Sequence, residues 1–326
     1  MKNNQYLKFL KKTAIILTIF TISDQVVGHI FHHLFFNIVA GENYRTTFTI
    51  DSTKADILVF GASRANHHYV PDILENELKM EVYNTGRDGN GLLYNYATFK
   101  AVTKRYSPKK IIFDIIPQEL IYSKVDYERL SSLSPYYNDH QEIREIIELK
   151  GPFEKYKMLS EIYPYNSQLI AIVYRNLSKT KDTFYKGYSP LHKKMDTMVA
   201  DNAKEESVGT IDKNKIKALN DIASYCNKNK ISLIFVCSPV FSNPKEKLRS
   251  KIIENIAISE NSRYFDFSCD STFDNHPEYF QDNLHLNEDG AKIFSKIICS
   301  IFDTNNTANP ITMSRLSPSN TYKSVR

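Results

Sequence analysis

Apolar residues recur along the chain in short runs, and helix-like spacing follows most of these runs. The runs lie at residues 57–60, 80–83, 111–116, 232–237 and 264–267. Runs of this length with few polar residues in alternation are typical of strands that are covered on both faces. Strands that alternate with helices predict an α/β fold built on a parallel sheet.

Local signals place three of the helices. Pro71 suits the first position of a helix, where its missing N–H costs nothing. Within residues 212–229, apolar side chains recur on one helical face at Ile216, Leu219 and Ile222. Asn287 is a favourable cap for a last helix, because its side chain can accept a hydrogen bond from the first turn. These helices are expected to cover the sheet.

The alternation is interrupted at about residues 118–210, a helical, tyrosine-rich stretch with breaks at Pro135, Pro164 and Gly187. An insertion at the carboxyl end of a strand lies where α/β folds bind ligands. The stretch is therefore either a lid or substrate wall, or a helical subdomain that only covers the sheet. Residues 304–326 are rich in Asn, Thr, Ser and Pro, which predicts a disordered tail.

The N-terminus combines positive charge with a long apolar stretch. The first twelve residues carry four lysines and no acid. Residues 13–36 are mostly apolar, and their polar residues are three threonines, Ser23, Asp24, Gln25 and three histidines. A membrane-spanning helix needs about 20 residues. We therefore predict that residues 1–40 form a cytoplasmic stub and an uncleaved signal anchor in the inner membrane, with the rest of the chain on the periplasmic side. A cleaved signal peptide and a soluble amphipathic helix are the alternatives.

Composition narrows the function classes. The chain has 326 residues and a net charge of +5, and its lysines occur in pairs rather than in blocks. Nothing resembles a zinc finger, a P-loop or an aromatic RNA-binding signature, so nucleic acid is not an expected partner. Cysteines lie far apart, without CxxC spacing, at Cys226, Cys237, Cys269 and Cys299. Buried free thiols are expected, a disulfide is the alternative, and no metal site is predicted.

A serine follows the first strand directly. In FGASRANHHY, residues 60–69, Ser63 lies on the turn into a helix. A serine attacks a carbonyl only where a base removes its proton and donors hold the oxyanion. The turn lacks the second glycine of the GxSxG pattern, so Ser63 is either a nucleophile or an ordinary serine at a strand-to-helix turn. His67 and His68 are the nearest candidate bases.

A glycine-rich loop follows the second strand, and it reads NTGRDGNG at residues 84–91. Glycine lets the backbone approach a ligand closely or adopt positive φ. The N–H of Gly89 is therefore a candidate oxyanion donor, and an ordinary loop with a helix cap is the alternative. The glycine spacing does not fit a dinucleotide-binding fingerprint.

A third motif, DNLHLNEDGA at residues 282–291, precedes the last helix. Asp282 and His285 are three residues apart on a turn, so both side chains can point the same way. Asp282 can hold the Nδ1–H of His285, which leaves Nε2 to deprotonate a serine. An isolated DxxH is common by chance. Before a capped C-terminal helix, in an α/β chain with a serine at a strand end, it is much more specific.

In their order along the chain, GAS, NTGRDG and DNLH resemble the blocks of the SGNH (GDSL-type) hydrolase family. The resemblance covers roughly residues 55–116 and 231–302. It implies that residues 41–303 form a flavodoxin-like three-layer sandwich with the helical insertion. It also implies ester hydrolysis or acyl transfer, with no metal or organic cofactor.

Carried over by position, the resemblance gives each residue a role. Ser63 is the nucleophile and also supplies an oxyanion donor through its N–H, and Gly89 supplies a second donor. His285 is the base and Asp282 orients it. His67 and His68 then become residues of the site rim or of the packing.

The third block departs from the family pattern, which usually has Gly-x-Asn-Asp after the third core strand. Residues 113–120 read FDIIPQEL, with no asparagine, and Gln118 is the only amide nearby. Losing one oxyanion donor costs about 3 kcal/mol of transition-state stabilisation. Membrane-anchored relatives with similarly loose third blocks take part in O-acetylation of cell-surface polysaccharides.

The resemblance therefore implies an acylated carbohydrate as substrate, with an acetyl ester expected, and a membrane acyl-transfer protein as a partner. The alternative is a catalytically inactive protein of this fold that binds glycan or a membrane partner. Substrate-binding residues cannot be assigned from the sequence.

Overall fold

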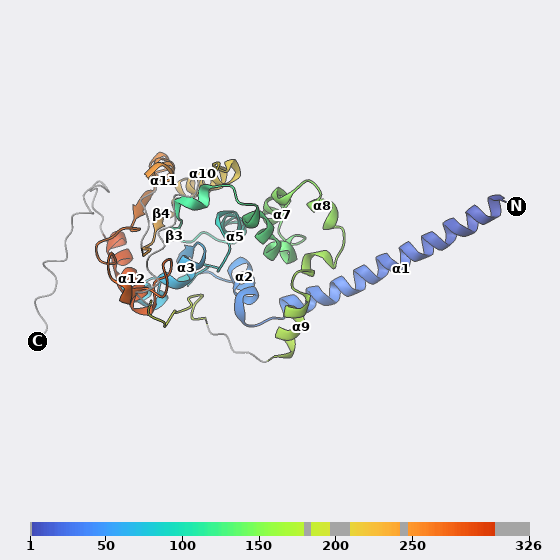
Figure 1. Cartoon of the computed structure of the whole chain (residues 1–326), viewed down its shortest axis with the longest axis horizontal. Helices are drawn as coiled ribbons and strands as arrows, with labels where there is room; N and C mark the ends of the chain where they lie inside the picture. Colours follow the sequence, from blue (N-terminus) through green and yellow to red (C-terminus); the bar gives the residue numbers. More distant parts are fainter. Residues whose placement is uncertain (1, 179–183, 196–208, 242–246, 304–326) are drawn as a thin grey trace, which may run out of the picture. The chain divides into compact units, whose positions relative to one another are not determined.

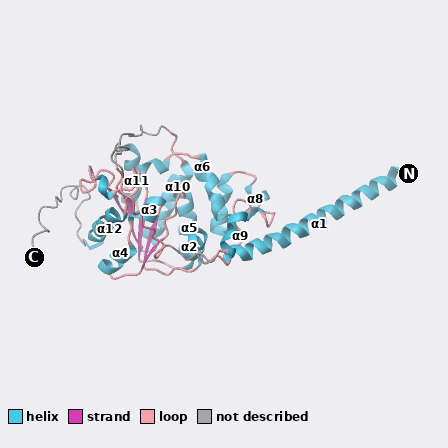
Figure 2. Ribbon diagram, turned by 60° about the horizontal axis from the view of Figure 1, so that its bottom comes forward, coloured by secondary structure: helices cyan, strands magenta, loops and turns pink. Residues whose placement is uncertain are grey.

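The structure is a computed structural model of the chain (Figures 1 and 2). Its internal contacts divide the chain into two compact units. Unit 1 comprises Met1–Thr53, Ala97–Arg105 and Ser123–Thr183, and unit 2 comprises Lys54–Tyr96, Tyr106–Tyr122 and Phe184–Arg326. The described residues are 2–178, 184–195, 209–241 and 247–303. The predicted tail at 304–326 and parts of the predicted insertion lie outside them.

Unit 2 is built on a five-stranded, all-parallel sheet with the strand order β2-β1-β3-β4-β5. The strands are β1 (Ile57–Phe60), β2 (Val82–Asn84), β3 (Lys110–Asp114), β4 (Ser232–Cys237) and β5 (Arg263–Asp266). The predicted α/β fold with a parallel sheet is therefore confirmed. β1 and β4 have the predicted bounds, whereas β2 begins and ends later in the chain than expected and β3 ends before Ile115.

The α-helices and 3₁₀ turns of unit 2 alternate with these strands. They are α3 (Ser63–His68), α4 (Pro71–Leu78), the first part of α5 (Leu92–Arg105), η1 (Pro117–Leu120), α10 (Lys213–Lys228), α11 (Lys247–Ser259), η6 (Pro277–Tyr279) and α12 (Glu288–Asp303). Asp212 caps α10 by accepting from the N–H of Asn214 at 2.8 Å, and Asn287 accepts from the N–H of Gly290 at 3.1 Å at the start of α12. All three helices that local signals predicted are present.

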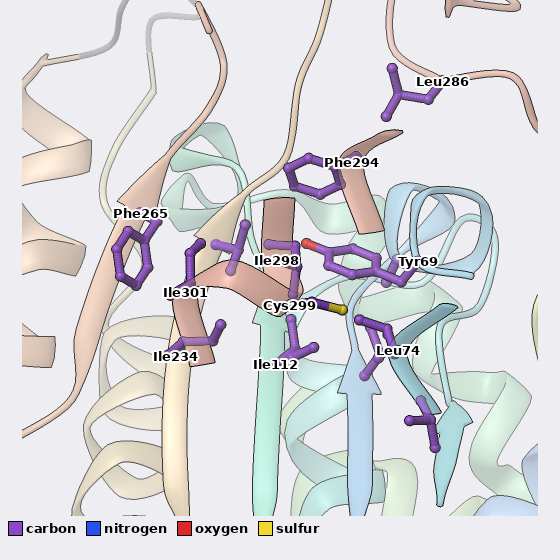
Figure 3. Close-up of a cluster of buried hydrophobic side chains, with 14 of the residues drawn as sticks. Tyr69, Leu74, Ile112, Ile234, Phe265, Leu286, Phe294, Ile298, Cys299 and Ile301 are labelled. Carbon is purple, nitrogen blue, oxygen red and sulfur yellow. The ribbon is translucent and has the colours of Figure 1, made fainter. Parts of the chain in front are cut away.

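Apolar side chains fill both faces of the sheet. On one face, strand residues such as Ile112 and Ile234 pack with Leu74 of α4 and with Phe294 and Ile298 of α12 (Figure 3). On the other face, the rings of Phe60, Phe113 and Phe235 follow one another across β1, β3 and β4, with centroids 6.1 and 5.8 Å apart. Burying a side chain of this size contributes about 1.5–3 kcal/mol. A sheet covered on both faces exposes its loops only at the strand ends, where the polar motifs lie.

Unit 1 is helical in the part of the chain that the structure describes. Its elements are α1 (Lys2–Phe36), α2 (Gly41–Asp51), the second part of α5, α6 (Lys124–Arg129), η2 (Leu130–Tyr136), α7 (Gln141–Ile147), η3 (Glu148–Lys150), α8 (Glu154–Lys157), η4 (Tyr163–Tyr165) and α9 (Leu169–Leu177). Of the predicted helical stretch at 118–210, the part up to Leu177 carries helices, whereas its described residues 184–195 form none. Buried Tyr136 and Tyr165 both pack against Phe35 at the end of α1.

α1 is long and apolar enough to cross a membrane, over Asn4–Phe36. Large apolar side chains remain exposed along most of its length, among them Ile16, Phe20 and Ile30. A helix with this much uncovered apolar surface is costly to leave in water. The helix therefore fits the N-terminal span that the sequence predicts.

Candidate active site

A tight turn at the carboxyl end of β1 positions Ser63. Gly61 has φ +147°, and a Cβ there would lie 2.7 Å from the Cβ of Ala65 and 2.8 Å from the carbonyl oxygen of Asp114. Glycine is therefore required at this position. α3 begins at Ser63, so the N–H of Ser63 belongs to a first turn that lacks carbonyl partners within the helix. The hydroxyl and the N–H of Ser63 thus lie together at the end of the strand.

Ser63, His285 and Asp282 form one chain of hydrogen bonds, although 222 residues separate the first two. The Nε2 of His285 lies 2.7 Å from the Oγ of Ser63. Its Nδ1 lies 2.9 and 3.0 Å from the two carboxylate oxygens of Asp282. Because a carboxylate only accepts, Nδ1 carries the proton and Nε2 accepts from the serine O–H. The structure therefore brings together the three residues that the sequence selects, and we call them the Ser63 triad.

Asp282 is held by its own turn as well as by His285. Its Oδ1 also accepts from the N–H groups of Leu284, at 2.8 Å, and of His285, at 3.0 Å. Partial burial raises the pKa of Asp282, but the hydrogen bonds from His285 and Leu284 outweigh it and lower the pKa below its ordinary 3.8. Asp282 is therefore ionised at neutral pH, as an orienting carboxylate must be.

His68 is fully buried, and both of its ring nitrogens are occupied. Nε2 accepts from the N–H of Leu286 at 2.9 Å, so Nδ1 carries the proton and donates to the Oγ of Ser238 at 2.9 Å. Burial lowers the pKa of His68 well below 6.5, and the charge of Arg64 lowers it further. His68 is therefore neutral, and these bonds give it a packing role: it fixes the residue next to His285.

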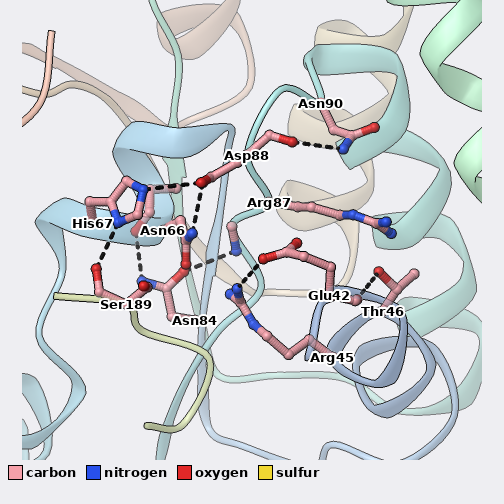
Figure 4. Close-up of polar contacts among 12 residues, drawn as sticks. Glu42, Arg45, Thr46, Asn66, His67, Asn84, Arg87, Asp88, Asn90 and Ser189 are labelled. Carbon is pink, nitrogen blue, oxygen red and sulfur yellow. Dashed lines mark hydrogen bonds and ion pairs between the residues drawn. The ribbon is translucent and has the colours of Figure 1, made fainter. Parts of the chain in front are cut away.

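His67 lies at the rim of the site and holds a carboxylate of the glycine-rich loop (Figure 4). Its Nδ1 donates to the carbonyl oxygen of Ser189 at 2.7 Å, and its Nε2 lies 3.2 Å from Asp88. Asn66 donates to the other oxygen of Asp88 at 2.7 Å. The ring of His67 stands edge-on to that of His285, with centroids 5.7 Å apart. Asp88, whose side chain is 52% exposed, is therefore a fixed carboxylate close to the triad.

A second polar group lies beneath the site, and we call it the Arg64 cluster: Arg64, Asp114 and Tyr69. Arg64 and the hydroxyl of Tyr69 each donate to one oxygen of Asp114 at 2.7 Å, and Arg64 also donates to the carbonyl oxygen of Ser238 at 3.3 Å. All three side chains are buried. Burial lowers the pKa of Arg64, but the negative charge of Asp114 outweighs it and raises that pKa above its usual value. Arg64 therefore stays charged in its buried place.

The loop that carries the predicted donor Gly89 packs against the turn that carries Ser63. The N–H of Arg87 donates to the carbonyl oxygen of Gly61 at 3.2 Å. A Cβ on Gly86 would lie 2.4 Å from the backbone nitrogen of Asn66 in α3, so this approach also requires glycine. Gly89 itself has φ +71°. The loop is thus placed beside the turn that carries Ser63, and the role of Gly89 as a donor stays a prediction.

The end of β3, where the family pattern has a third oxyanion donor, carries a carboxylate instead. Asp114 ends the strand, and its two oxygens accept from the Arg64 cluster. Gln118 lies in η1, and its Oε1 is buried without a hydrogen-bond partner among the described residues. In that part of the chain no hydrogen bond joins Gln118 to the triad. The third donor therefore stays unassigned.

Sequence reasoning did not select Asp88, Asp114 or Ser238 as residues of this region. Asp114 and Ser238 each stand at the carboxyl end of a buried strand, which is the one signal that could have found them. Asp88 lies inside a motif that was read for its glycines alone. Its link to His67 joins two segments that are separate in sequence, so no local pattern marks it.

Three of the four cysteines match the sequence expectation of buried free thiols. Cys226, Cys237 and Cys299 are buried free thiols, and Cys269 is an exposed one. Burial raises the pKa of Cys226 to about 12 and, against the charge of Arg64, that of Cys237 to about 12. These two thiols are therefore protonated at neutral pH and suited to packing. Among the described residues, no group of three or more His, Cys, Asp or Glu is arranged to hold a metal ion.

Comparisons with known proteins add no family to this description. Neither protein-family models nor curated protein sequences gave a match. The candidate site therefore rests on the residues and geometry described above.

Proposed function

We propose that this chain is a membrane-anchored serine esterase or O-acyltransferase of the SGNH type, acting on acyl esters of cell-surface carbohydrate. The observation that carries the proposal is the unbroken chain of hydrogen bonds from Asp282 through His285 to Ser63. The strand order 2-1-3-4-5, which is that of flavodoxin-like folds, supports it. The resemblance of the three sequence blocks to the family gives the substrate class.

In the first half of the reaction, the Oγ of Ser63 attacks the acyl carbonyl while its proton passes to the Nε2 of His285. Asp282 stabilises the imidazolium that forms and keeps its Nδ1–H in place. The N–H groups of Ser63 and Gly89 stabilise the oxyanion of the tetrahedral intermediate. The intermediate collapses when the Nε2–H protonates the leaving alcohol, and an acyl-serine remains.

In the second half, His285 removes a proton from the acceptor, which then attacks the acyl-serine. Water as acceptor gives hydrolysis, and a sugar hydroxyl gives acyl transfer. The proton returns from Nε2 to the Oγ of Ser63, so the enzyme ends as it began. His67 fixes Asp88 at the rim of the site. There Asp88 is placed to accept hydrogen bonds from hydroxyl groups of the sugar that carries the acyl group or of the sugar that receives it.

One observation favours the second candidate function, a protein of this fold that binds glycan without catalysis. The end of β3 carries Asp114 where an amide donor would stand, and a carboxylate that accepts from Arg64 and Tyr69 cannot donate to an oxyanion. Removing one donor from an oxyanion hole typically lowers kcat by about 10²–10³-fold. An enzyme that lacks this donor would be slow. A protein of this fold that has lost catalysis could keep the same three residues, so the triad alone does not separate the two functions.

Covalent labelling decides between the two. The full chain in detergent is treated with a fluorophosphonate probe, which reacts only with an activated serine. We expect labelling at Ser63, abolished by Ser63→Ala and by His285→Ala. Ser189→Ala is the matched control, because the contacts of Ser189 with α3 are made by its backbone, whose carbonyl accepts from His67 and whose N–H donates to the carbonyl of Asn66. Absence of label on the folded wild-type chain, or equal label on Ser63→Ala, would remove the catalytic proposal.

Membrane anchoring through α1 is part of the proposal, with the lysines of the first twelve residues inside and the remainder outside. Support comes from the length and hydropathy of α1 and from the positive charge that precedes it. A reporter enzyme fused after residue 45 is expected to be active only when it reaches the extracytoplasmic side. Activity of the same fusion in the cytoplasm would contradict this orientation.

A further inference from the structure

The glycine-rich loop at residues 84–91 contains a β-turn formed by Arg87, Asp88, Gly89 and Asn90. The N–H of Asn90 donates to the carbonyl oxygen of Arg87 at 3.2 Å, which closes the turn. Gly89, the third residue of the turn, has φ +71°. A positive φ at the third residue is typical of a type II turn, where glycine is favoured. The N–H of Gly89, the proposed oxyanion donor, therefore belongs to the central peptide of a type II turn.

The central peptide of such a turn has two orientations. Type I and type II turns differ mainly in ψ of the second residue and φ of the third, which change by about 150° and about 170°. Together these changes turn the peptide over while the neighbouring Cα atoms stay in place. Glycine adopts either φ readily, so Gly89 alone does not fix the direction of its N–H. Another group has to hold this peptide if the donor is to keep one direction.

The side chain of Asn90 holds the other end of this peptide. Its Nδ2 donates to the carbonyl oxygen of Asp88 at 3.1 Å (Figure 4). In a trans peptide, the C=O of Asp88 and the N–H of Gly89 point in opposite directions. A hydrogen bond that fixes the carbonyl therefore fixes the N–H as well. Asn90 is only 7% exposed, so water competes little for this bond.

Two further asparagines, both buried, hold the surroundings of the turn in place. Asn66 of α3 donates to the carboxylate of Asp88 at 2.7 Å. Asn95 of α5 donates to the carbonyl oxygen of Gly91 at 3.0 Å and accepts from the N–H of Gly61 at 3.1 Å. The turn is thus tied to α3 and to the strand end that precedes this helix. Rotation of the central peptide is the freedom that these two ties do not restrict.

We propose that Asn90 is a positioning residue for the reaction: it keeps the N–H of Gly89 directed at the oxyanion of the tetrahedral intermediate. The inference rests on the proposed function, because it assigns a role within that reaction. A donor that is already fixed needs no reorganisation when the charge develops, which increases its contribution. This fixing matters most in a site where the end of β3 carries the carboxylate of Asp114 in place of an amide donor.

Two substitutions of Asn90, made in the full chain in detergent, test the proposal. Asn90→Asp keeps the shape of the side chain, but its carboxylate cannot donate and repels the carbonyl of Asp88. Asn90→Ala removes the donor without adding a charge. For both variants we expect kcat with an aryl acetate to fall by about 10–100-fold, less than the 10²–10³-fold that complete loss of a donor costs. KM should change by less than about two-fold, because the bond acts on the transition state.

An aryl trifluoromethyl ketone measures stabilisation of the oxyanion directly. The Oγ of Ser63 adds to its carbonyl carbon, the proton passes to His285, and the carbonyl oxygen becomes an oxyanion like that of the intermediate. We expect the inhibition constant of this ketone to rise in both Asn90 variants by the same factor as kcat falls. A merely structural role of Asn90 would lower the melting temperature without this agreement.

Asn229→Ala is the matched control. Its side chain also donates to a backbone carbonyl, that of Tyr225 at 2.8 Å, but it lies between α10 and the start of β4, at the opposite edge of the parallel sheet. We expect its kcat, KM and ketone affinity to equal those of the wild type. Gly89→Ala gives the reference for a misdirected donor, because alanine rarely adopts φ +71° and the turn should change to type I. Its loss of kcat should be at least as large as that of Asn90→Ala.

The outcomes separate this inference from the proposed function. Unchanged kcat in folded Asn90→Ala, or in Gly89→Ala, would overturn the inference, while turnover by the wild type would leave the proposed function standing. A loss confined to KM would overturn it too, because Asn90 would then act on substrate binding. Absence of both turnover and ketone binding in the folded wild type would instead remove the proposed function, and the inference with it. If Asn90→Asp does not fold, Asn90→Ala and Gly89→Ala still decide, because neither introduces a buried charge.

Discussion

Two polar groups lie at the strand ends of unit 2. Each contains an aspartate, but the two aspartates differ in their exposure and in their hydrogen bonds. In the Ser63 triad, Asp282 is half exposed and the chain of hydrogen bonds ends at a hydroxyl. In the Arg64 cluster, each oxygen of Asp114 accepts a hydrogen bond and every side chain is buried. The triad is arranged to pass a proton, whereas the cluster is arranged to keep its charges fixed.

The difference teaches what burial does to a carboxylate. A buried ion pair contributes little net stability, but removing one partner leaves an uncompensated charge, which is costly. A half-exposed carboxylate is screened by water, and its removal costs little stability. The triad should therefore be separable from folding, and the cluster should not. His68 stands between the two, because it contacts the loop of His285 and is held by Ser238.

The largest expected effect is on turnover, from His285→Ala. Without its base, Ser63 is a weak nucleophile, and we expect hydrolysis of an aryl acetate to fall by roughly 10⁴-fold or more. The melting temperature should change little, because the His285 side chain is only partly buried. His67→Ala is the matched control and should retain much of the activity. A collapse of activity in folded His67→Ala would mean that the base has been misassigned.

For Arg64→Met we expect the opposite result, a loss of stability with most of the activity retained. Asp114 would remain buried without its main partner, and the free energy of unfolding should fall by about 3–5 kcal/mol in urea titrations. Activity per folded molecule should stay within roughly ten-fold of the wild type, because Arg64 touches neither His285 nor Asp282 in the described contacts. The double variant Arg64→Met/Asp114→Asn should recover part of the loss. If it recovers none, the ion pair is not what Arg64 contributes.

For His68→Ala we expect losses of both stability and activity, each smaller than the largest loss expected above. The change leaves the N–H of Leu286 and the hydroxyl of Ser238 without their partner, so unfolding free energy should drop by about 1–3 kcal/mol. The loop of His285 also loses a support, and a shift of about 1 Å can lower kcat by about 10²-fold. Ser238→Ala, which removes only one of the two bonds, should show smaller losses of both kinds. Loss of turnover as complete as in His285→Ala would contradict a packing role.

Strand positions could be predicted where the signal is local. β1 and β4 are continuous apolar runs, and their bounds match the structure. β2 is displaced toward Asn84, a residue that strands usually avoid. Asn84 is tolerated because its N–H donates to the carbonyl oxygen of Lys186 at 2.9 Å and its side chain donates to that of Ala65 at 2.6 Å. Such partners, distant in sequence, leave no trace in a local pattern.

The same limit applies to the candidate site, where contacts between residues close in sequence could be predicted and contacts between distant residues could not. Asp282 and His285 are three residues apart, so their pairing is visible in the sequence. The Arg64 cluster joins residues 45 and 50 positions apart, and burial of a charged pair has no sequence signature. Asp24 is a similar case in unit 1: the sequence shows an acid inside an apolar stretch, and its partners Ser160 and Glu161 lie 136 and 137 residues away.

The smallest effect is a pH dependence of the folding stability that comes from Asp282. Hydrogen bonds lower the pKa of Asp282 below 3.8 in the folded protein, so its ionised form favours folding at neutral pH. That contribution is fully present above the ordinary pKa of an aspartate and is lost as pH falls through the lowered value. It should be below about 1 kcal/mol, because the carboxylate is half exposed and screened. Urea titrations of the wild type and Asp282→Asn should therefore differ slightly at neutral pH, and the difference should shrink below pH 3.8. A difference that grows as the solution is acidified would mean that Asp282 is stabilised in its protonated form, and the proposed orientation of His285 would then have to be abandoned.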